Sequence, residues 1–91
     1  MKKMNIEEFE NKEILLSQLE FELISDLIRA RKSKNYTQQQ LADEASIIRE
    51  TIAKIENQIV SPQISTLIKI LLPLGYTLKI EKIEEGKKEE I

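Results

Sequence analysis

The stretch "TQQQLADEASIIRETIAKIEN", from Thr37 to Asn57, holds two short helical patterns separated by a tight turn. Thr37 is a good N-cap for the first helix, and Gln40 stands at the capping-box position. We expect that helix to end near Ala45 and the second to run from about residue 48 to 58. The apolar residues of both patterns face one another around the turn; they are Leu41, Ala42, Ala45, Ile47, Ile52 and Ile55. Two short helices joined in this way, the second one basic, form a helix-turn-helix pattern.

The polar residues of the second helix are the ones that would enter a DNA major groove. They are Arg49, Glu50, Thr51, Lys54 and Asn57. An arginine near a helix N-terminus can bond a guanine bidentately, and a glutamate can accept from a cytosine amino group. Glu50 also repels phosphate and gains from the helix dipole, so base reading and simple helix stabilisation both remain open for it.

The helical pattern before the motif runs from about Lys12 to Lys34 and carries two apolar stripes. One stripe holds Leu16, Leu19, Leu23, Leu27 and Ala30, and the other holds Ile14, Phe21, Ile24 and Ile28. An ordinary surface helix needs only one apolar stripe. The second stripe predicts a contact with a second copy or a partner, and deeper burial within the same domain is the alternative.

The chain after the motif contains a third short helix and then a strand-like pattern. Ser61-Pro62 is a helix start signal, Pro73 stops or kinks that helix, and Gly75 marks its end. The alternation that follows puts Tyr76, Leu78 and Ile80 on one face, as in a β-strand. A single strand leaves unpaired edges, so we expect it to pair with a second copy or a partner. The alternative is an extended segment packed on its own helices.

Composition excludes several classes of function. The 91 residues include no cysteine and no histidine. The usual general base, the usual zinc ligands and any disulfide framework are therefore missing. We expect no enzyme activity, no cofactor and no metal. No apolar run is long enough to cross a membrane, which predicts a cytoplasmic protein without a membrane partner. The net charge is −2, but residues 29–69 hold seven bases against four acids.

The segment from Leu27 to Gly75 resembles the Cro/repressor (Xre) helix-turn-helix family. The shared features are Arg31, "TQQQLA" at 37–42, "TIAKIEN" at 51–57 and "SP…STLIKILLPLG" at 61–75. The resemblance implies an all-α, lambda-repressor-like helix-turn-helix bundle of about five helices with one C-terminal β-strand. The long leading helix and the single strand after "LG" are also similar in layout to HigA-type antitoxins.

The patterns and the resemblance together divide the chain, and the resemblance assigns roles to its residues. Polar composition predicts a flexible segment at 1–11 and a charged tail at 84–91, alternation predicts a dimerisation or partner-pairing strand at 76–83, and the resemblance implies a DNA-binding domain at 12–75. The family residue matching Gln38 touches phosphate or a neighbouring base, and those matching Arg49, Glu50 and Lys54 face base edges. Arg31 and Glu56 match a pair that forms an internal salt bridge.

Three residues depart from the family pattern. Ile48 stands where a capping Ser or Thr is common, and losing that cap costs about 1 kcal/mol. Ser46 replaces the glycine of the turn, and Gln58 replaces the glycine after the second helix.

The leading hypothesis is a homodimeric repressor that binds a pseudo-palindromic DNA site. As the antitoxin of a type II toxin–antitoxin pair, it would also bind a small toxin from the adjacent gene and repress its own operon. The acidic leading segment would suit a basic toxin by charge complementarity. Two alternatives are a stand-alone phage-like or stress-response repressor and an interaction adaptor that has lost DNA binding.

Overall fold

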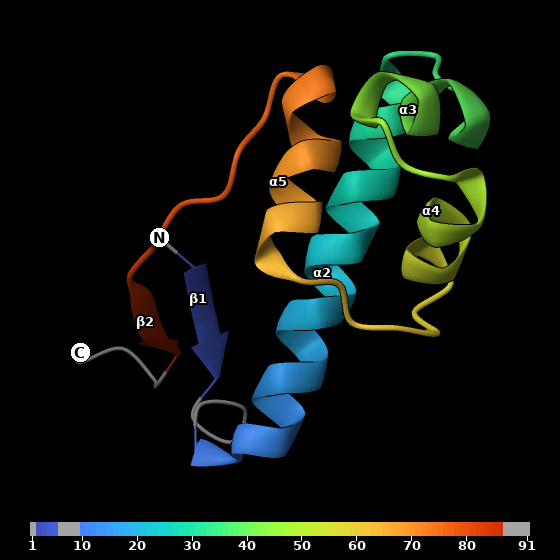
Figure 1. The fold of residues 1–91 in the computed structure, drawn as a ribbon. Helices are drawn as coiled ribbons and strands as arrows, with labels where there is room; N and C mark the ends of the chain where they lie inside the picture. The colour runs from blue at the N-terminus through green and yellow to red at the C-terminus, as the bar shows by residue number, and fades with distance from the viewer. Residues whose placement is uncertain (1, 6–9, 87–91) are drawn as a thin grey trace. The chain divides into compact units, whose positions relative to one another are not determined.

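The computed structural model describes residues 2–5 and 10–86 of the chain. The elements follow in the order β1 (Lys2–Asn5), α2 (Lys12–Ser33), α3 (Gln38–Ala45), α4 (Arg49–Glu56), α5 (Ile64–Leu71), the 3-10 helix η1 (Leu72–Leu74) and β2 (Ile83–Gly86), as Figure 1 shows. The chain divides into two compact units. One is Phe21–Leu78, and the other combines Met1–Glu20 with Lys79–Ile91.

The unit of residues 21–78 is a helical bundle with one apolar core. Leu41 of α3, Ile52 of α4 and Ile70 of α5 have no exposed surface, and Leu27 of α2 has almost none. Fully burying such a side chain stabilises the fold by about 1.5–3 kcal/mol relative to leaving it exposed. Ala42 is also fully buried. Its small side chain lets α3 and α4 pack closely, which positions the second helix of the motif.

The end of α5 shows how the chain leaves this core. Helix α5 passes into η1, which contains Pro73, and Gly75 then adopts a φ of 90°. Glycine takes this left-handed conformation without the steric cost of a Cβ atom. The backbone N–H of Gly75 donates to Leu72 at 2.9 Å, and that of Tyr76 donates to Leu71 at 3.0 Å. These two bonds satisfy carbonyl groups that the helix end would otherwise leave free.

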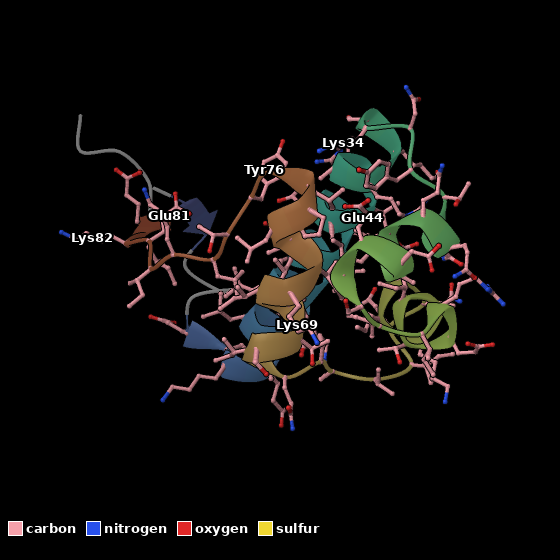
Figure 2. All side chains as sticks on the ribbon, turned by 45° about the horizontal axis from the view of Figure 1, so that its top comes forward. Lys34, Glu44, Lys69, Tyr76, Glu81 and Lys82 are labelled. Atoms are coloured by element: carbon pink, nitrogen blue, oxygen red, sulfur yellow. The ribbon has the colours of Figure 1, made fainter. Side chains whose placement is uncertain are left out.

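A lysine joins the end of α2 to η1. Lys34, labelled in Figure 2, donates through Nζ to the carbonyl oxygen of Pro73 at 2.8 Å. The same ammonium group lies 5.4 Å from the ring centroid of Tyr36, within the range of a cation–π contact. Two elements far apart in sequence are thereby held together beside the first turn of the motif.

The other unit contains a short parallel pair of strands. Strands β1 and β2 pair with Lys2 opposite Ile83 and Asn5 opposite Gly86. Strand β1 lies within the segment 1–11 that we expected to be flexible, and α2 begins at Lys12, where the helical domain was predicted to start.

The C-terminal strand begins later than the prediction of 76–83. Residues 76–82 have no regular secondary structure, and β2 covers Ile83–Gly86. Alternating apolar residues indicate an extended chain, but a strand also needs a hydrogen-bonded neighbour, and here that neighbour is β1. The predicted charged tail, 84–91, overlaps β2 in part, and its residues 87–91 lie outside the described residues.

The described part of the chain has neither a membrane-spanning helix nor a metal-binding cluster. None of its helices is long and apolar enough to cross a membrane. Within residues 2–5 and 10–86 there is also no cluster of carboxylates arranged to hold a metal ion.

Candidate nucleic-acid interface

Helix α3 begins with a complete capping box. Thr37 Oγ1 accepts from the backbone N–H of Gln40 at 3.0 Å, and Gln40 Oε1 accepts from the backbone N–H of Thr37 at 2.8 Å. Both interactions satisfy amide groups that the first turn leaves without helical partners. The first helix of the motif therefore has a well-defined start, as the sequence indicated.

The turn between α3 and α4 is built on a left-handed serine. Ser46 ends α3 with a φ of 58°. This conformation costs a residue other than glycine about 1–2 kcal/mol. The backbone N–H of Ile47 then donates to the carbonyl oxygen of Ala42 at 2.9 Å, which closes the helix end. Ile47 packs partly buried against the core, so apolar contact also holds the turn.

Helix α4 presents one polar face and one apolar face. Ile52 and Ile55 are buried, whereas Arg49, Glu50 and Lys54 are exposed. Asn57, just after the helix, is exposed, and Thr51 is half-buried. Eight helical residues span about 12 Å. An α-helix with its side chains is about 10–12 Å across, so it fits the major groove of B-DNA, which is about 12 Å wide.

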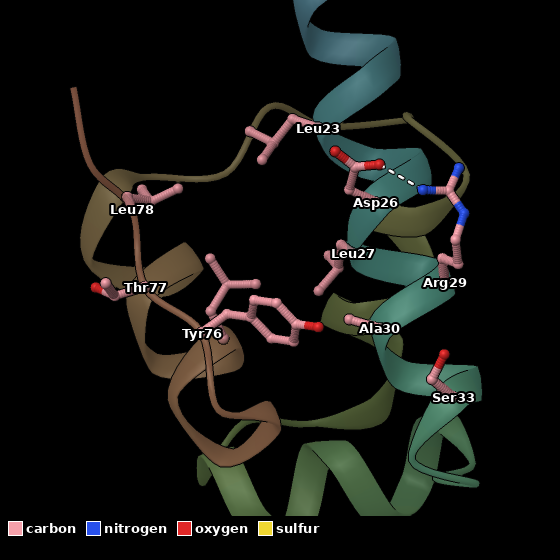
Figure 3. Close-up of a pocket in the computed structure, with 10 residues that line it drawn as sticks. Leu23, Asp26, Leu27, Arg29, Ala30, Ser33, Tyr76, Thr77 and Leu78 are labelled. Atoms are coloured by element: carbon pink, nitrogen blue, oxygen red, sulfur yellow. Dashed lines mark hydrogen bonds and ion pairs between the residues drawn. The ribbon is translucent and has the colours of Figure 1, made fainter. Parts of the chain in front are cut away.

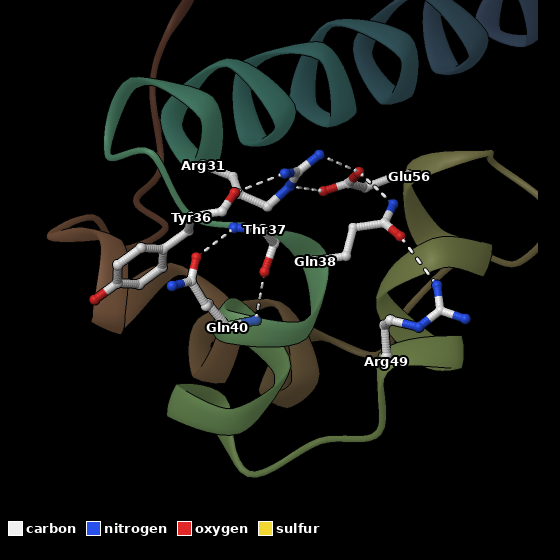
Figure 4. A network of polar contacts seen from close by, with 7 residues as sticks. All are labelled: Arg31, Tyr36, Thr37, Gln38, Gln40, Arg49 and Glu56. Carbon is white, nitrogen blue, oxygen red and sulfur yellow. Dashed lines mark hydrogen bonds and ion pairs between the residues drawn. The ribbon is translucent and has the colours of Figure 1, made fainter.

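A buried ion pair fixes α4 to α2. Arg31 Nε donates to Glu56 Oε2 at 2.7 Å, and Arg31 Nη2 donates to Glu56 Oε1 at 3.0 Å. The two side chains are only 10% and 5% exposed. Arg31 Nη1 also donates to the carbonyl oxygen of Tyr36 at 2.8 Å, in the loop before α3. One guanidinium group thus joins α2, this loop and the last residue of α4 (Figure 4).

The network continues to the exposed face through Gln38. Its Nε2 donates to Glu56 Oε1 at 2.9 Å, and its Oε1 lies 3.4 Å from Arg49 Nη1 (Figure 4). Glu56 is paired with a guanidinium group, so its charge is locally compensated and Glu50 is the exposed acid of α4. The first residues of α3 and α4 are held side by side, with polar groups available to a nucleic acid.

A family model described as "Helix-turn-helix" matches residues 27–80, which is more than half of the chain. The chain belongs to the Xre-type helix-turn-helix family. The match covers every residue of the motif and both partners of the buried ion pair.

Two relatives agree with this assignment. An "Uncharacterized HTH-type transcriptional regulator" of Haemophilus influenzae is 40% identical over 72 residues, which is 79% of this chain and 74% of the relative. A solved chain described as "Toxin-Antitoxin module from Streptococcus pneumoniae" is 35% identical, with a TM-score of 0.68 and 81% of each chain covered. The predicted all-α helix-turn-helix fold is confirmed. The protein is a DNA-binding transcriptional regulator of this family, which is not a class of enzymes.

The predicted partner-contact residues do not form one exposed surface in this family member. Ile24 is 6% exposed and belongs to the core, and Ile28 packs against that core half-buried. The second stripe of α2 is therefore partly a core stripe, because α2 is wrapped by its own bundle from Ile24 onward. Phe21, at 58%, and Ile14, at 48%, do remain exposed.

The predicted contacts after Gly75 lie in different surroundings. Tyr76 and Leu78 line a cavity of about 350 Å³ whose opposite wall includes Leu23 and Leu27 of α2 (Figure 3). Leu78 packs partly buried against the core, while Ile80 is 97% exposed. The extended segment thus packs on its own helices as far as residue 78, which was the alternative left open by the sequence.

Sequence reasoning missed two features of this part of the fold. The first is the hydrogen bond from Gln38 to Glu56, whose residues lie 18 positions apart. The second is an exposed apolar group, formed by Ile59 and Val60 in the connection from α4 to α5 and by Ile64 at the start of α5. The signal for the second was present, because "IVSPQI" places three aliphatic residues around a helix start without an apolar periodicity.

Proposed function

We propose that this regulator binds a pseudo-palindromic operator as a homodimer and represses the operon that contains its own gene. The observation that supports this most directly is the polar face of α4. Arg49, Glu50 and Lys54 are exposed there, while Glu56 anchors the far end of the helix to α2 and α3. An anchored helix with its N-terminal residues exposed is suited to reading base edges.

In this proposal each exposed residue has a separate task. Arg49 bonds a guanine, and Glu50 accepts from a cytosine amino group. Lys54, Thr51 and Asn57 contact bases or phosphates further along the groove. Gln38 contacts phosphate at the start of α3 and supports Arg49 through the contact at 3.4 Å.

The homodimer follows from the small size of one reading helix. Eight residues reach only a few base pairs, so a specific site needs two copies of α4 about one DNA turn apart, roughly 34 Å. The candidates for the dimer contact are still Tyr76, Leu78 and Ile80. Leu78 packs partly on the core of its own bundle, so less of its surface is available to a second copy.

Fluorescence anisotropy tests the DNA-binding part of the proposal. The probe is a duplex from immediately upstream of the protein's own gene, measured across a salt series beside a scrambled duplex. We expect submicromolar affinity and at least a tenfold preference for the native duplex. Each phosphate contact should add about 0.9 to the slope of log affinity against log salt. Equal, weak binding to both duplexes would contradict the proposal and favour an adaptor.

We further propose that the protein is the antitoxin of a type II toxin–antitoxin pair and binds a small basic toxin through α2. Two observations support this. One is the likeness to a chain from a toxin–antitoxin module. The other is the exposed part of α2, where Leu16 and Phe21 are 60% and 58% exposed. Residues 10–26 carry five acids against one base, a net charge of −4.

The charge of this surface favours a basic partner over a second copy. Two copies of a segment with charge −4 would repel each other, whereas a basic protein would be attracted and its encounter accelerated. Apolar side chains among the acids would then supply the buried contact area. The stand-alone repressor has the same helix-turn-helix and no such partner.

Co-expression with the adjacent gene separates the antitoxin from the stand-alone repressor. We expect the tagged protein to retain the neighbouring gene product on affinity resin in 0.15 M salt. Phe21→Ala should release it, and Ile64→Ala should retain it, since Ile64 is an apolar residue on another helix that is 70% exposed, against 58% for Phe21. If the protein purified alone, the antitoxin proposal would be contradicted and the stand-alone repressor would be favoured.

A further inference from the structure

Ile48 has no structural role that explains an isoleucine at its position. It is the N-cap residue of α4, with φ −79° and ψ 148°, and it makes no side-chain capping bond. Its side chain is 66% exposed. Scattered exposed aliphatic residues are ordinary on protein surfaces, so exposure alone carries no argument. The position of Ile48 is the informative observation, because Ser, Thr, Asp or Asn at this N-cap would stabilise the helix and isoleucine does not.

The neighbouring residue, Ile47, already supplies the apolar packing at this turn. Ile47 precedes the N-cap and is partly buried against the core, where Ile52 lies fully buried four residues into the helix. This is the arrangement of a hydrophobic staple. Ile47 therefore fixes the entry of the chain into α4, and Ile48 is left pointing outward beside Arg49.

We infer that Ile48 is a specificity-determining residue that contacts the C5-methyl group of a thymine in the major groove. The inference rests on the proposed binding of α4 to DNA. The N-terminal residues of a recognition helix approach base edges most closely, and Ile48 immediately precedes Arg49 there. The thymine methyl is the apolar feature that the major-groove edges offer, and apolar side chains recognise it by contact.

Phosphate is excluded as the partner of this side chain. Phosphate contacts come from charged, hydroxyl or amide side chains and from backbone N–H groups, and an isoleucine side chain has no donor. A Ser or Thr at the same position would cap the helix and could bond phosphate. With Ile48, the helix loses that cap and gains a surface that removes one methyl group from water. In this proposal, recognition of a thymine by Ile48 takes the place of the phosphate contact that a Ser or Thr could make, which does not depend on the DNA sequence.

The test uses duplexes that the full-length protein selects from a random-sequence pool. Each thymine in the selected site is then replaced by deoxyuridine, which removes only the methyl group, and affinities are measured by fluorescence anisotropy. We expect one thymine per half-site whose replacement weakens binding about fourfold, the effect of one buried methyl group. Because the contact is apolar, this ratio should hold across a salt series while the overall affinity falls.

Protein variants assign the effect to the side chain. With Ile48→Ala the thymine and deoxyuridine duplexes should bind equally, and with Ile48→Val most of the difference should remain. Ile59→Ala removes an aliphatic side chain of the same exposure, 67%, and should keep the full difference. Circular dichroism of each variant checks that the helices are intact.

The outcomes separate this inference from the function on which it rests. Selection that enriches no sequence would overturn both. A selected site in which no thymine responds to replacement would overturn the role of Ile48 and leave sequence-specific binding in place. A thymine effect that is unchanged in Ile48→Ala would do the same, because another group would then be reading the methyl.

Discussion

Helices α3 and α4 have equal length but begin in opposite ways. Helix α3 has both hydrogen bonds of a capping box, whereas α4 begins at Ile48 without a side-chain cap. The contacts that hold α4 lie on its buried face and at its far end, where Glu56 meets Arg31 and Gln38. The difference indicates that α3 is stabilised locally and that α4 is stabilised by the bundle. The start of α4 is thereby left free for recognition.

The largest expected effect comes from cutting the anchor of α4. Glu56→Ala leaves the Arg31 guanidinium buried without its carboxylate and takes an acceptor from Gln38. We expect the free energy of unfolding to fall by about 3–5 kcal/mol, the usual result of removing one partner of a buried pair. Urea denaturation measures it.

An exposed ion pair on α2 is the matched control. Arg29 and Asp26 meet at 2.6 Å, but their side chains are 71% and 68% exposed. Asp26→Ala should change stability by less than about 1 kcal/mol, since solvent screens such pairs. If the two variants lost equal stability, the anchor of α4 would not lie in the buried pair.

The second expected effect tests the local stability of α3. Thr37→Ala removes the hydroxyl that accepts from the backbone N–H of Gln40 at 3.0 Å. We expect a loss of about 1 kcal/mol, within the usual 0.5–2 kcal/mol for a cap. A thermal melt should record a fall of about 4–8 °C for a domain of this size. An unchanged melt would show that α3, like α4, depends on the bundle alone.

The third prediction reverses the missing cap of α4. Ile48→Thr supplies a hydroxyl at the N-cap and should raise the free energy of unfolding by about 0.5–1 kcal/mol. Specific DNA binding should weaken in the same variant, because threonine lacks the ethyl branch of isoleucine and so makes a smaller apolar contact with the proposed thymine methyl. Urea denaturation and anisotropy on the selected duplex measure the two effects. A variant that gained both stability and affinity would show that isoleucine at the N-cap does not contribute to DNA binding.

The helix-turn-helix could be predicted from sequence because its signals are local. Thr37 and Gln40 are three residues apart, and the apolar residues of α3 and α4 follow helical spacing. The pairing of Arg31 with Glu56 was implied only by the family resemblance. The two residues lie 25 positions apart, so no local sequence pattern predicts their contact.

Non-local features escaped the sequence for physical reasons. Ile24 and Phe21 belong to the same apolar stripe of α2 in a periodicity argument, and only packing decides that Ile24 is buried while Phe21 is exposed. Alternation at 76–80 indicated an extended chain, but the location of β2 depends on its partner β1, which lies at the opposite end of the sequence. The hydrogen bond from Gln38 to Glu56 likewise requires the assembled bundle.

The smallest predicted effect lies at the turn that joins the two helices. Ser46 has a φ of 58°, so Ser46→Gly relieves the steric cost of a left-handed residue and also makes the unfolded chain more flexible. The two terms oppose each other, and we expect a net gain of about 0.5 kcal/mol. Urea denaturation with finely spaced concentrations, repeated several times, resolves a change of this size in the free energy of unfolding.

Glu44→Gly is the matched control for this substitution, because it places glycine inside α3 at an exposed position two residues away. There the same flexibility is added without any strain to relieve, so stability should fall by about 1 kcal/mol. Opposite signs for the two variants would locate strain in the turn between a locally capped helix and an uncapped one. Equal losses of stability would mean that Ser46 adopts its left-handed conformation at no cost. The turn would then be free of backbone strain, like the capped start of α3.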